Sequence, residues 1–134
     1  MSKKITNPFK MNKLFHYFLA HEILEDRKYR SILDFGCGEG VFISSLKSQS
    51  KSLYGYDVDQ VNLENAKKKY KYIQFNLGQV GEKLPYKSNK FDLVFLFHVL
   101  EHVDNEKKTI DEIYRVLKKG GQLVVSSPYK GMFS

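Results

Sequence analysis

The feature that most constrains this chain is the segment at residues 32–40, ILDFGCGEG, where a short apolar run ends in an acid and glycines follow at alternate positions. This order indicates a strand, a tight turn and then a helix. Glycine reaches positive φ at low cost and lets a ligand come close to the backbone, because it has no Cβ. In α/β folds, a turn at the carboxyl end of the first strand is where a nucleotide-like ligand usually sits. We therefore expect a ligand site at Gly36, Gly38 and Gly40, with Asp57 as its distant partner.

Size and composition favour one domain, 1–134. The chain has 134 residues, of which 42% are hydrophobic, enough for a sizeable core. The basic start resembles the first part of a signal peptide, but His16, His21 and Glu22 interrupt the apolar residues that follow, so we expect an amphipathic helix there. No apolar run reaches the roughly 18 residues that a membrane helix needs. A single cysteine excludes an internal disulfide, and we expect a cytoplasmic protein without a membrane segment.

The net charge of +7 comes almost entirely from lysines that are spread over predicted turns and helix faces. Only Arg27, Arg30 and Arg115 are arginines. Clustered arginines interleaved with aromatic residues would favour nucleic acid, whereas scattered lysines usually form a solvated surface. The charge therefore gives no reason to expect a nucleic-acid partner.

Hydrophobic periodicity predicts alternating strands and helices. An N-terminal helical segment at 8–28, with its helix over about 12–27, precedes a core at 31–127. The apolar run 91–97 lacks alternation, which is typical of a strand buried on both faces. Gly120 should end the last helix. Such alternation implies a parallel sheet with right-handed crossovers. The predicted strands are 32–35, 52–56, 72–75, 91–97 and 122–126, and the helices between them are 41–48, 60–70 and 106–118.

Several readings of the turn compete. A dinucleotide fingerprint requires G-x-G-x-x-G, but its last position is Val41 here, which weakens an NAD site. Asp57 does not discriminate between a dinucleotide and another nucleoside cofactor, because a carboxylate at the end of the second strand can accept hydrogen bonds from both hydroxyls of any ribose. Asp34 and Asp57 could also simply cap the following turn or helix. Cys37 has no neighbouring base, so packing in a crowded turn explains it sufficiently.

A second motif follows the buried run 91–97. His98, Glu101 and His102 form H-x-x-E-H, a pattern found in some zinc proteases. Here the motif comes directly after a predicted buried strand and does not lie within a long amphipathic helix, so we expect no metal site.

Successive segments of the chain resemble the motifs of class I S-adenosylmethionine-dependent methyltransferases. These are LDFGCGEG, YGYDVD, LPYKSNKFDLV, HVLEHV and EIYRVLKKGGQLVVS, which together span residues 32–127. The likeness is greatest to the branch of quinone-biosynthesis and related small-molecule methyltransferases. It implies an α/β fold, a Rossmann-like three-layer sandwich with a mainly parallel sheet of order 3-2-1-4-5. Compared with that family's seven-stranded sheet, we expect the last two strands to be missing.

The resemblance also implies S-adenosyl-L-methionine as the cofactor, with S-adenosyl-L-homocysteine as product. Asp34 would hold the ammonium end, Asp57 the ribose hydroxyls, and Asn76 would stand where the family commonly has an aspartate that accepts from the adenine amino group. His98 would be a catalytic base or a substrate contact. The implied cofactor-binding residues are Asp34, Gly36, Cys37, Gly38, Gly40, Asp57, Val58, Asn76, Leu77 and His98.

The implied activity is methyl transfer to a small-molecule, sugar or lipid-like acceptor. The alternative is a non-catalytic S-adenosylmethionine-binding module or a fragment, and a third reading is a remnant that binds nothing. Without the two missing strands, the strand at 122–126 would be an open sheet edge, which natural proteins seldom leave exposed. We therefore expect either a fragment, or an oligomer or partner chain that covers this edge.

Overall fold

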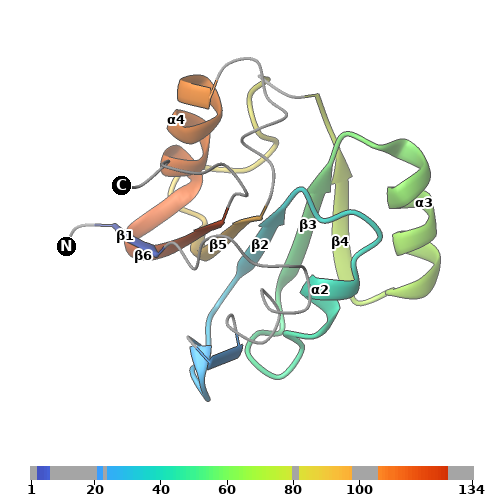
Figure 1. Cartoon of the computed structure of the whole chain (residues 1–134), viewed down its shortest axis with the longest axis horizontal. Helices are drawn as coiled ribbons and strands as arrows, with labels where there is room; N and C mark the ends of the chain where they lie inside the picture. Colours follow the sequence, from blue (N-terminus) through green and yellow to red (C-terminus); the bar gives the residue numbers. More distant parts are fainter. Residues whose placement is uncertain (1–2, 7–20, 23, 80–81, 98–105, 127–134) are drawn as a thin grey trace.

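The computed structural model describes residues 3–6, 21–22, 24–79, 82–97 and 106–126 of the chain. Within these residues, strands and helices alternate along the sequence (Figure 1). The strands are β1 (Lys4–Thr6), β2 (Ile32–Phe35), β3 (Leu53–Asp57), β4 (Ile73–Leu77), β5 (Phe91–Phe97) and β6 (Leu117–Ser126), and the helices are α2 (Val41–Ser44), α3 (Gln60–Lys69) and α4 (Glu106–Val116).

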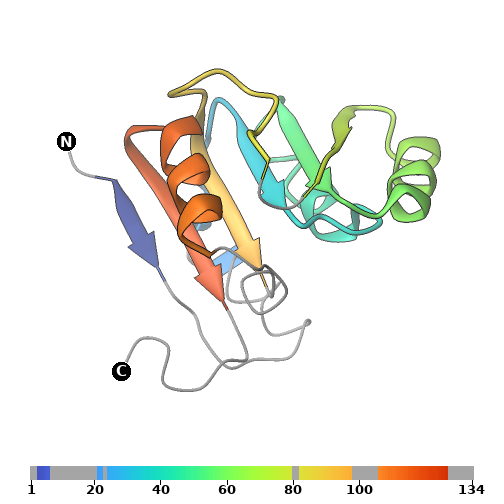
Figure 2. The ribbon, with the colours of Figure 1, turned by 90° about the horizontal axis from the view of Figure 1, so that it is seen from above.

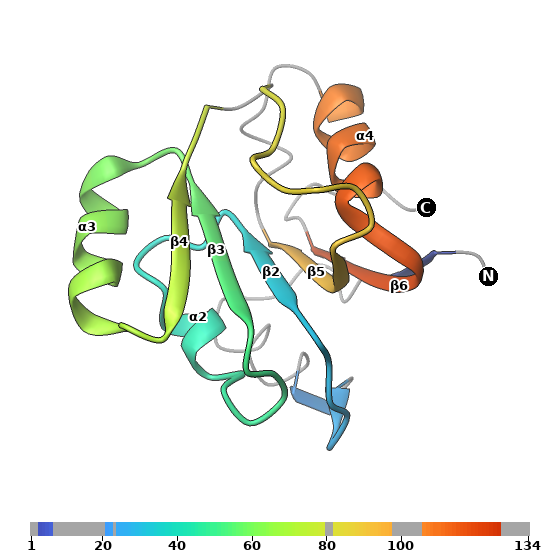
Figure 3. The ribbon, with the colours of Figure 1, turned by 180° about the vertical axis from the view of Figure 1, so that it is seen from behind.

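The six strands form one sheet in the order β1-β6-β5-β2-β3-β4, and every neighbouring pair is parallel. The five strands that the sequence predicted are β2 to β6 of this sheet, and their order is the predicted 3-2-1-4-5. The parallel arrangement brings the carboxyl ends of β2, β3 and β4 to one edge (Figure 3). This edge carries the glycine turn.

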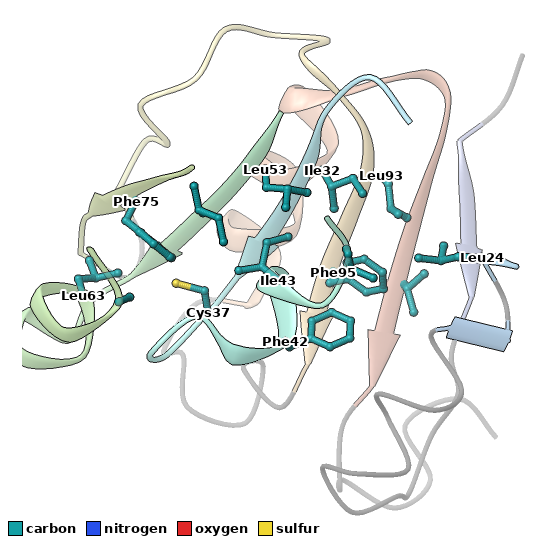
Figure 4. Packing of buried hydrophobic residues seen from close by; sticks show 14 residues of the cluster. Leu24, Ile32, Cys37, Phe42, Ile43, Leu53, Leu63, Phe75, Leu93 and Phe95 are labelled. Atoms are coloured by element: carbon teal, nitrogen blue, oxygen red, sulfur yellow. The ribbon is translucent and has the colours of Figure 1, made fainter. Parts of the chain in front are cut away.

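The sheet is the middle of three layers, because alternate residues of its strands enter two separate cores. One core joins Ile32 and Phe95 to α2 and α3, where it includes Phe42 and Leu63 (Figure 4). The other joins alternate strand residues such as Leu33 to Ile113 and Val116 of α4. Both faces of the sheet are therefore covered, which explains why β2 and β5 are apolar without alternation.

The edge of β6 is not open, and the expectation that it would be uncovered is wrong. β1 pairs with it in parallel, with Lys4 opposite Gln122 and Thr6 opposite Val124 (Figure 2). The N-terminal segment thus supplies the neighbour that we expected from another chain. A partner chain is not needed to cover the part of the edge that β1 occupies.

The last helix ends earlier than predicted. α4 stops at Val116 and β6 begins at the next residue, so Gly120 does not end the helix. Instead, Gly120 has φ 80° and lies within β6, where the pairing with β5 shifts from Phe91–Leu117 to Leu93–Gln122. The extra residues form a bulge, which a glycine with positive φ accommodates.

The boundaries of β3, α3 and β4 differ from the predictions by at most two residues, whereas α2 is much shorter than predicted. α2 covers only four residues of the predicted helix at 41–48. Most of the predicted helix at 12–27 lies outside the described residues, although Leu24 is fully buried in the core beside α2. No helix in the described part of the chain is both long enough and apolar enough to cross a membrane.

Candidate functional site

The site forms where β2 and β3 end side by side. Their register places Asp34 opposite Gly55 and Phe35 opposite Tyr56. The glycine turn then folds back on β3, because the backbone N–H groups of Gly36 and Cys37 both donate to the carbonyl oxygen of Tyr56, at 2.7 and 3.1 Å. The turn is therefore held against the end of the neighbouring strand.

Asp57 joins the end of β3 to the glycine turn. Its Oδ2 accepts a hydrogen bond from the backbone N–H of Gly38 at 2.7 Å. Its Oδ1 accepts from the N–H groups of Val58 and Asp59, at 2.7 and 3.0 Å. A carboxylate has about four lone-pair positions, so one on Oδ2 is left for a further donor. The helix N-cap is not Asp57 but Asp59, whose side chain accepts from Asn62.

Gly38 leaves space for a ligand. Its φ is +56°, and within the described part of the chain a Cβ built on it would meet no atom within 4 Å beyond its two chain neighbours. Gly40 has a different role, since a Cβ there would lie 2.8 Å from Cζ of Phe75 and 3.2 Å from Tyr70. Gly40 is buried and serves packing between the turn and β4. The open space above Gly38 is thus one part of the turn that a ligand can approach.

Two polar side chains of the turn are almost completely buried. Asp34 is 3% exposed and Cys37 is 7% exposed. Burial raises the pKa of the Cys37 thiol, and the negative charges of Asp34 and Asp57 raise this pKa further. Cys37 also packs in the core beside α2 and α3 (Figure 4). The thiol is therefore protonated and shielded, which supports the packing interpretation over a nucleophile.

The end of β4 adds an amide and an apolar surface. Leu77 pairs with Asp57 in the sheet and is 49% exposed, while Val58 is 47% exposed. Asn76 is half-buried, and its Oδ1 accepts a hydrogen bond from the Tyr86 hydroxyl at 3.0 Å. Two exposed apolar side chains beside a carboxylate and an amide suit a ligand that has both a flat apolar part and hydroxyl groups.

An ion pair on α4 holds the loop that carries Tyr86. Arg115 donates to the carbonyl oxygens of Leu84 and Tyr86, at 3.0 and 2.9 Å, and to Oε2 of Glu112 at 2.8 Å. Glu112 in turn accepts from the backbone N–H of Leu84 at 2.6 Å. This pair fixes the loop against α4, and through the loop it fixes the ring of Tyr86.

The sequence did not single out three residues that shape the site. Asp59 begins α3, Tyr86 binds Asn76, and Arg115 holds the loop. Only Asp59 had a local signal, because an aspartate directly before a predicted helix is a common N-cap. The contacts of Tyr86 and Arg115 join elements that are distant in sequence, which periodicity does not reveal.

The structure brings together most of the predicted site residues at the carboxyl ends of β2, β3 and β4. His98, Glu101 and His102 lie outside the described residues, and their roles stay predictions. Among the described residues, no group of three or more metal-ligating side chains comes together.

Comparison with known proteins gives a consistent result. A family model described as a methyltransferase domain matches residues 33–125. A probable S-adenosylmethionine-dependent methyltransferase of Mycolicibacterium smegmatis is 29% identical over 124 residues, which are 89% of this chain and 48% of that protein. A demethylmenaquinone methyltransferase of Leptospira interrogans is 30% identical over 88% of this chain and 51% of its own length.

A solved structure, that of the YcgJ protein from Bacillus subtilis, superposes with a TM-score of 0.75 at 24% identity and covers 84% of this chain and 50% of that one. At this identity the likeness shows the shared fold. The chain spans about half the length of the curated relatives that it matches, 48% and 51% for the two described above.

Proposed function

The chain belongs to the family of methyltransferase domains, and from that premise we propose that it binds S-adenosylmethionine at the carboxyl ends of β2, β3 and β4 and takes part in methyl transfer to a small-molecule acceptor. The observation that carries the proposal is the open space over Gly38, where no atom of the described residues, apart from its chain neighbours, lies within 4 Å of a built Cβ. A cofactor can come against the backbone there, beside the carboxylate that binds the same glycine.

The residues at this edge fit the parts of the cofactor. Asp57 has an acceptor position left on Oδ2 for a ribose hydroxyl, and a second hydroxyl can replace the N–H of Gly38 on the same carboxylate. Val58 and Leu77 expose apolar surface of the kind that packs against a nucleobase. Buried Asp34 gives the end of β2 a carboxylate that favours a positively charged ammonium nearby.

When bound, the cofactor supplies a methyl group on a sulfonium, which is already an activated leaving group. The chain's own residues then have to position the donor and exclude water, and no strongly nucleophilic side chain is required of them. The Cys37 thiol is buried and protonated, which agrees with a site that needs no nucleophilic side chain. His98 is proposed as the group that contacts the acceptor or takes its proton.

The acceptor class is inferred from the relatives. The relative from Leptospira interrogans is named for a quinone-type acceptor, demethylmenaquinone. We infer a small molecule, and a phenol or a related ring is the first class to test. Incubation with methyl-labelled S-adenosylmethionine and a panel of phenols, carboxylic acids and sugars should transfer label to at least one class.

A second candidate is a module that binds the cofactor without transferring the methyl group. It is favoured by the roles of the described site residues, since Asp57, Val58 and Leu77 fit contacts with the cofactor and the Cys37 thiol is buried and protonated. Binding of S-adenosylmethionine without label transfer to any acceptor would support the module over the enzyme. Absence of binding would contradict both.

A further inference from the structure

Resting on the proposed cofactor site, we propose that Tyr86 is a positioning residue, whose hydroxyl holds the Asn76 amide so that the amide nitrogen, a hydrogen-bond donor, is turned toward the nucleobase. The observation is the 3.0 Å hydrogen bond from the Tyr86 hydroxyl to Oδ1 of Asn76. An asparagine amide has an acceptor at one end and a donor group at the other, and the two ends are nearly equal in size. A neighbour that binds one end therefore decides what the other end offers.

The hydroxyl group of Tyr86 carries a proton that needs an acceptor. Its side chain belongs to the core beside α4, it is 8% exposed, and burial raises the pKa of its hydroxyl well above the ordinary value, so the group keeps its proton. A buried O–H group needs an acceptor. Among the described residues, Oδ1 of Asn76 is the acceptor that it reaches.

Turning the amide over would place its NH₂ group against the Tyr86 O–H. The NH₂ group could still donate to the Tyr86 oxygen, but the buried O–H would then have no acceptor among the residues that the structure describes, at a cost of about 1–3 kcal/mol. The observed orientation is therefore preferred. Since the two amide ends diverge from Cγ, Nδ2 lies on the side away from the Tyr86 hydroxyl, and Asn76 as a whole is only half-buried.

The ring of Tyr86 is itself fixed from two sides. Arg115 binds the carbonyl oxygens on either side of Pro85, those of Leu84 and Tyr86. The aromatic ring packs edge-to-face against Tyr54 and Phe91, with centroids 5.9 and 5.0 Å apart. The hydroxyl therefore has little freedom to leave Asn76, and the amide is held in one orientation.

With the amide in this orientation, Asn76 offers the purine a hydrogen-bond donor and not an acceptor. Adenine offers a donor at its amino group and acceptors at its ring nitrogens, whereas a 6-oxo purine has an acceptor where the amino group was. A carboxylate or an amide oxygen would select the amino group. A donor at Asn76 pairs with a ring nitrogen or with a 6-oxo group, so it selects only weakly between the two bases.

The test compares two ligands on the same protein by calorimetry, S-adenosylhomocysteine and its 6-oxo counterpart S-inosylhomocysteine. In the wild type we expect dissociation constants within about threefold of each other. In Tyr86→Phe the amide is free to turn its oxygen outward, and the ratio should shift by at least about threefold in favour of the adenosyl compound. Tyr54→Phe removes a hydroxyl from the neighbouring ring and should leave the ratio unchanged.

Asn76→Asp provides a second variant if Tyr86→Phe folds poorly. One carboxylate oxygen keeps the Tyr86 hydrogen bond and the other faces the ligand as an acceptor, so preference for the adenosyl compound should rise by about tenfold or more. A ratio that neither variant shifts overturns the role of Tyr86 while leaving the proposed function intact. Failure of the wild type to bind either compound overturns the proposed function, and this inference with it.

Discussion

The carboxylate of Asp57 accepts a hydrogen bond from the backbone nitrogen of Gly38 at 2.7 Å. Nineteen residues separate the two in sequence, yet they face each other because β2 and β3 are neighbouring parallel strands whose carboxyl ends coincide. This hydrogen bond links the glycine turn to Asp57, the last residue of β3. A ligand that binds one of them must therefore also contact, or displace, the other.

Gly38→Ala should impair binding more than folding. The new methyl group meets no atom of the described, non-neighbouring residues within 4 Å, and the remaining cost is that of a left-handed φ, +56°, about 1–2 kcal/mol for a residue other than glycine. The methyl group would, however, fill the space proposed for the cofactor. Urea unfolding should show a small loss of stability, and affinity for S-adenosylhomocysteine should fall by more than about tenfold.

Gly40→Ala is the matched control for this change. Its Cβ would lie 2.8 Å from the Phe75 ring inside the core, also at positive φ, so we expect a larger loss of stability, about 2–4 kcal/mol. Native affinity in Gly38→Ala would show that the ligand does not lie against the turn.

Removing Arg115 should loosen the loop that carries Tyr86. Arg115→Ala leaves the carbonyl oxygens of Leu84 and Tyr86 without this donor and leaves the Glu112 carboxylate unpaired. We expect a loss of about 2–4 kcal/mol in the free energy of unfolding, since the side chains of the pair are only 23% and 18% exposed.

The control is a pair of the same kind on the surface of the same helix. Lys107 and Asp111 are 84% and 62% exposed, so Lys107→Ala should change the free energy of unfolding by at most about 0.5 kcal/mol. Equal effects of Arg115→Ala and Lys107→Ala would mean that the loop does not depend on Arg115.

The Glu112–Arg115 pair should also give stability a pH dependence. The hydrogen bond from Arg115 lowers the pKa of Glu112 in the folded protein, and the backbone N–H of Leu84 adds to this lowering. A carboxyl group whose pKa is lower when folded stabilises the protein above the unfolded pKa of about 4.3, and this contribution is lost as pH falls through the folded pKa.

The stability of the wild type should therefore exceed that of Glu112→Gln at pH 7, and the difference should shrink as the pH is lowered from about 5 to about 3. Denaturant unfolding at several pH values measures both proteins. A difference that stays constant over this range would show that Glu112 is not held as a carboxylate by the pair.

Cys37 should resist thiol reagents in the folded protein. It is 7% exposed, and burial raises its pKa, so little thiolate is available to react. A thiol-specific chromogenic reagent at pH 8 should label the folded chain at least ~100-fold more slowly than the chain in urea. Rapid labelling under native conditions would mean that the turn opens or that the thiol is not packed in the core.

Gly55→Ala, a change in β3, would test how tightly Cys37 packs between the glycine turn and the neighbouring strands. A Cβ at residue 55 would lie 2.7 Å from Sγ of Cys37 and 2.6 Å from the Phe75 ring. We expect a loss of about 1–3 kcal/mol from overpacking, measured by urea unfolding. An unchanged stability would mean that the turn and β4 can separate at no cost.

Local patterns in the sequence predict the strands and the site that depends on their carboxyl ends. The apolar run 91–97 became β5 with the predicted bounds, because burial on both faces leaves a signal in composition alone. The acids and glycines at 34–40 and 57 were placed together, since parallel strands of a predicted order end at one edge. The end of α2 was not predicted, because the apolar pattern continues to about residue 48 whereas the helix ends at Ser44.

Contacts that depend on distant parts of the chain could not be predicted in this way. β1 has only three residues and no periodicity, and its partner on β6 lies more than a hundred residues further along. The hydrogen bond between Tyr86 and Asn76 depends on how the loop at 82–90 is held by Arg115. The resemblance placed Asn76 at the position beside the adenine, but it could not show that Oδ1 of Asn76 accepts a hydrogen bond from Tyr86.

The most direct test is a calorimetric titration of the wild type and of Asp57→Ala with S-adenosylhomocysteine, with Asp59→Ala as control. Asp57 binds the glycine turn and keeps one acceptor position for the ligand, whereas Asp59 only caps α3. We expect binding to the wild type, a loss of affinity of at least about tenfold in Asp57→Ala, and native affinity in Asp59→Ala with about 1 kcal/mol less stability. No heat of binding with the folded wild type, or equal affinity in Asp57→Ala, would contradict a cofactor site at this turn.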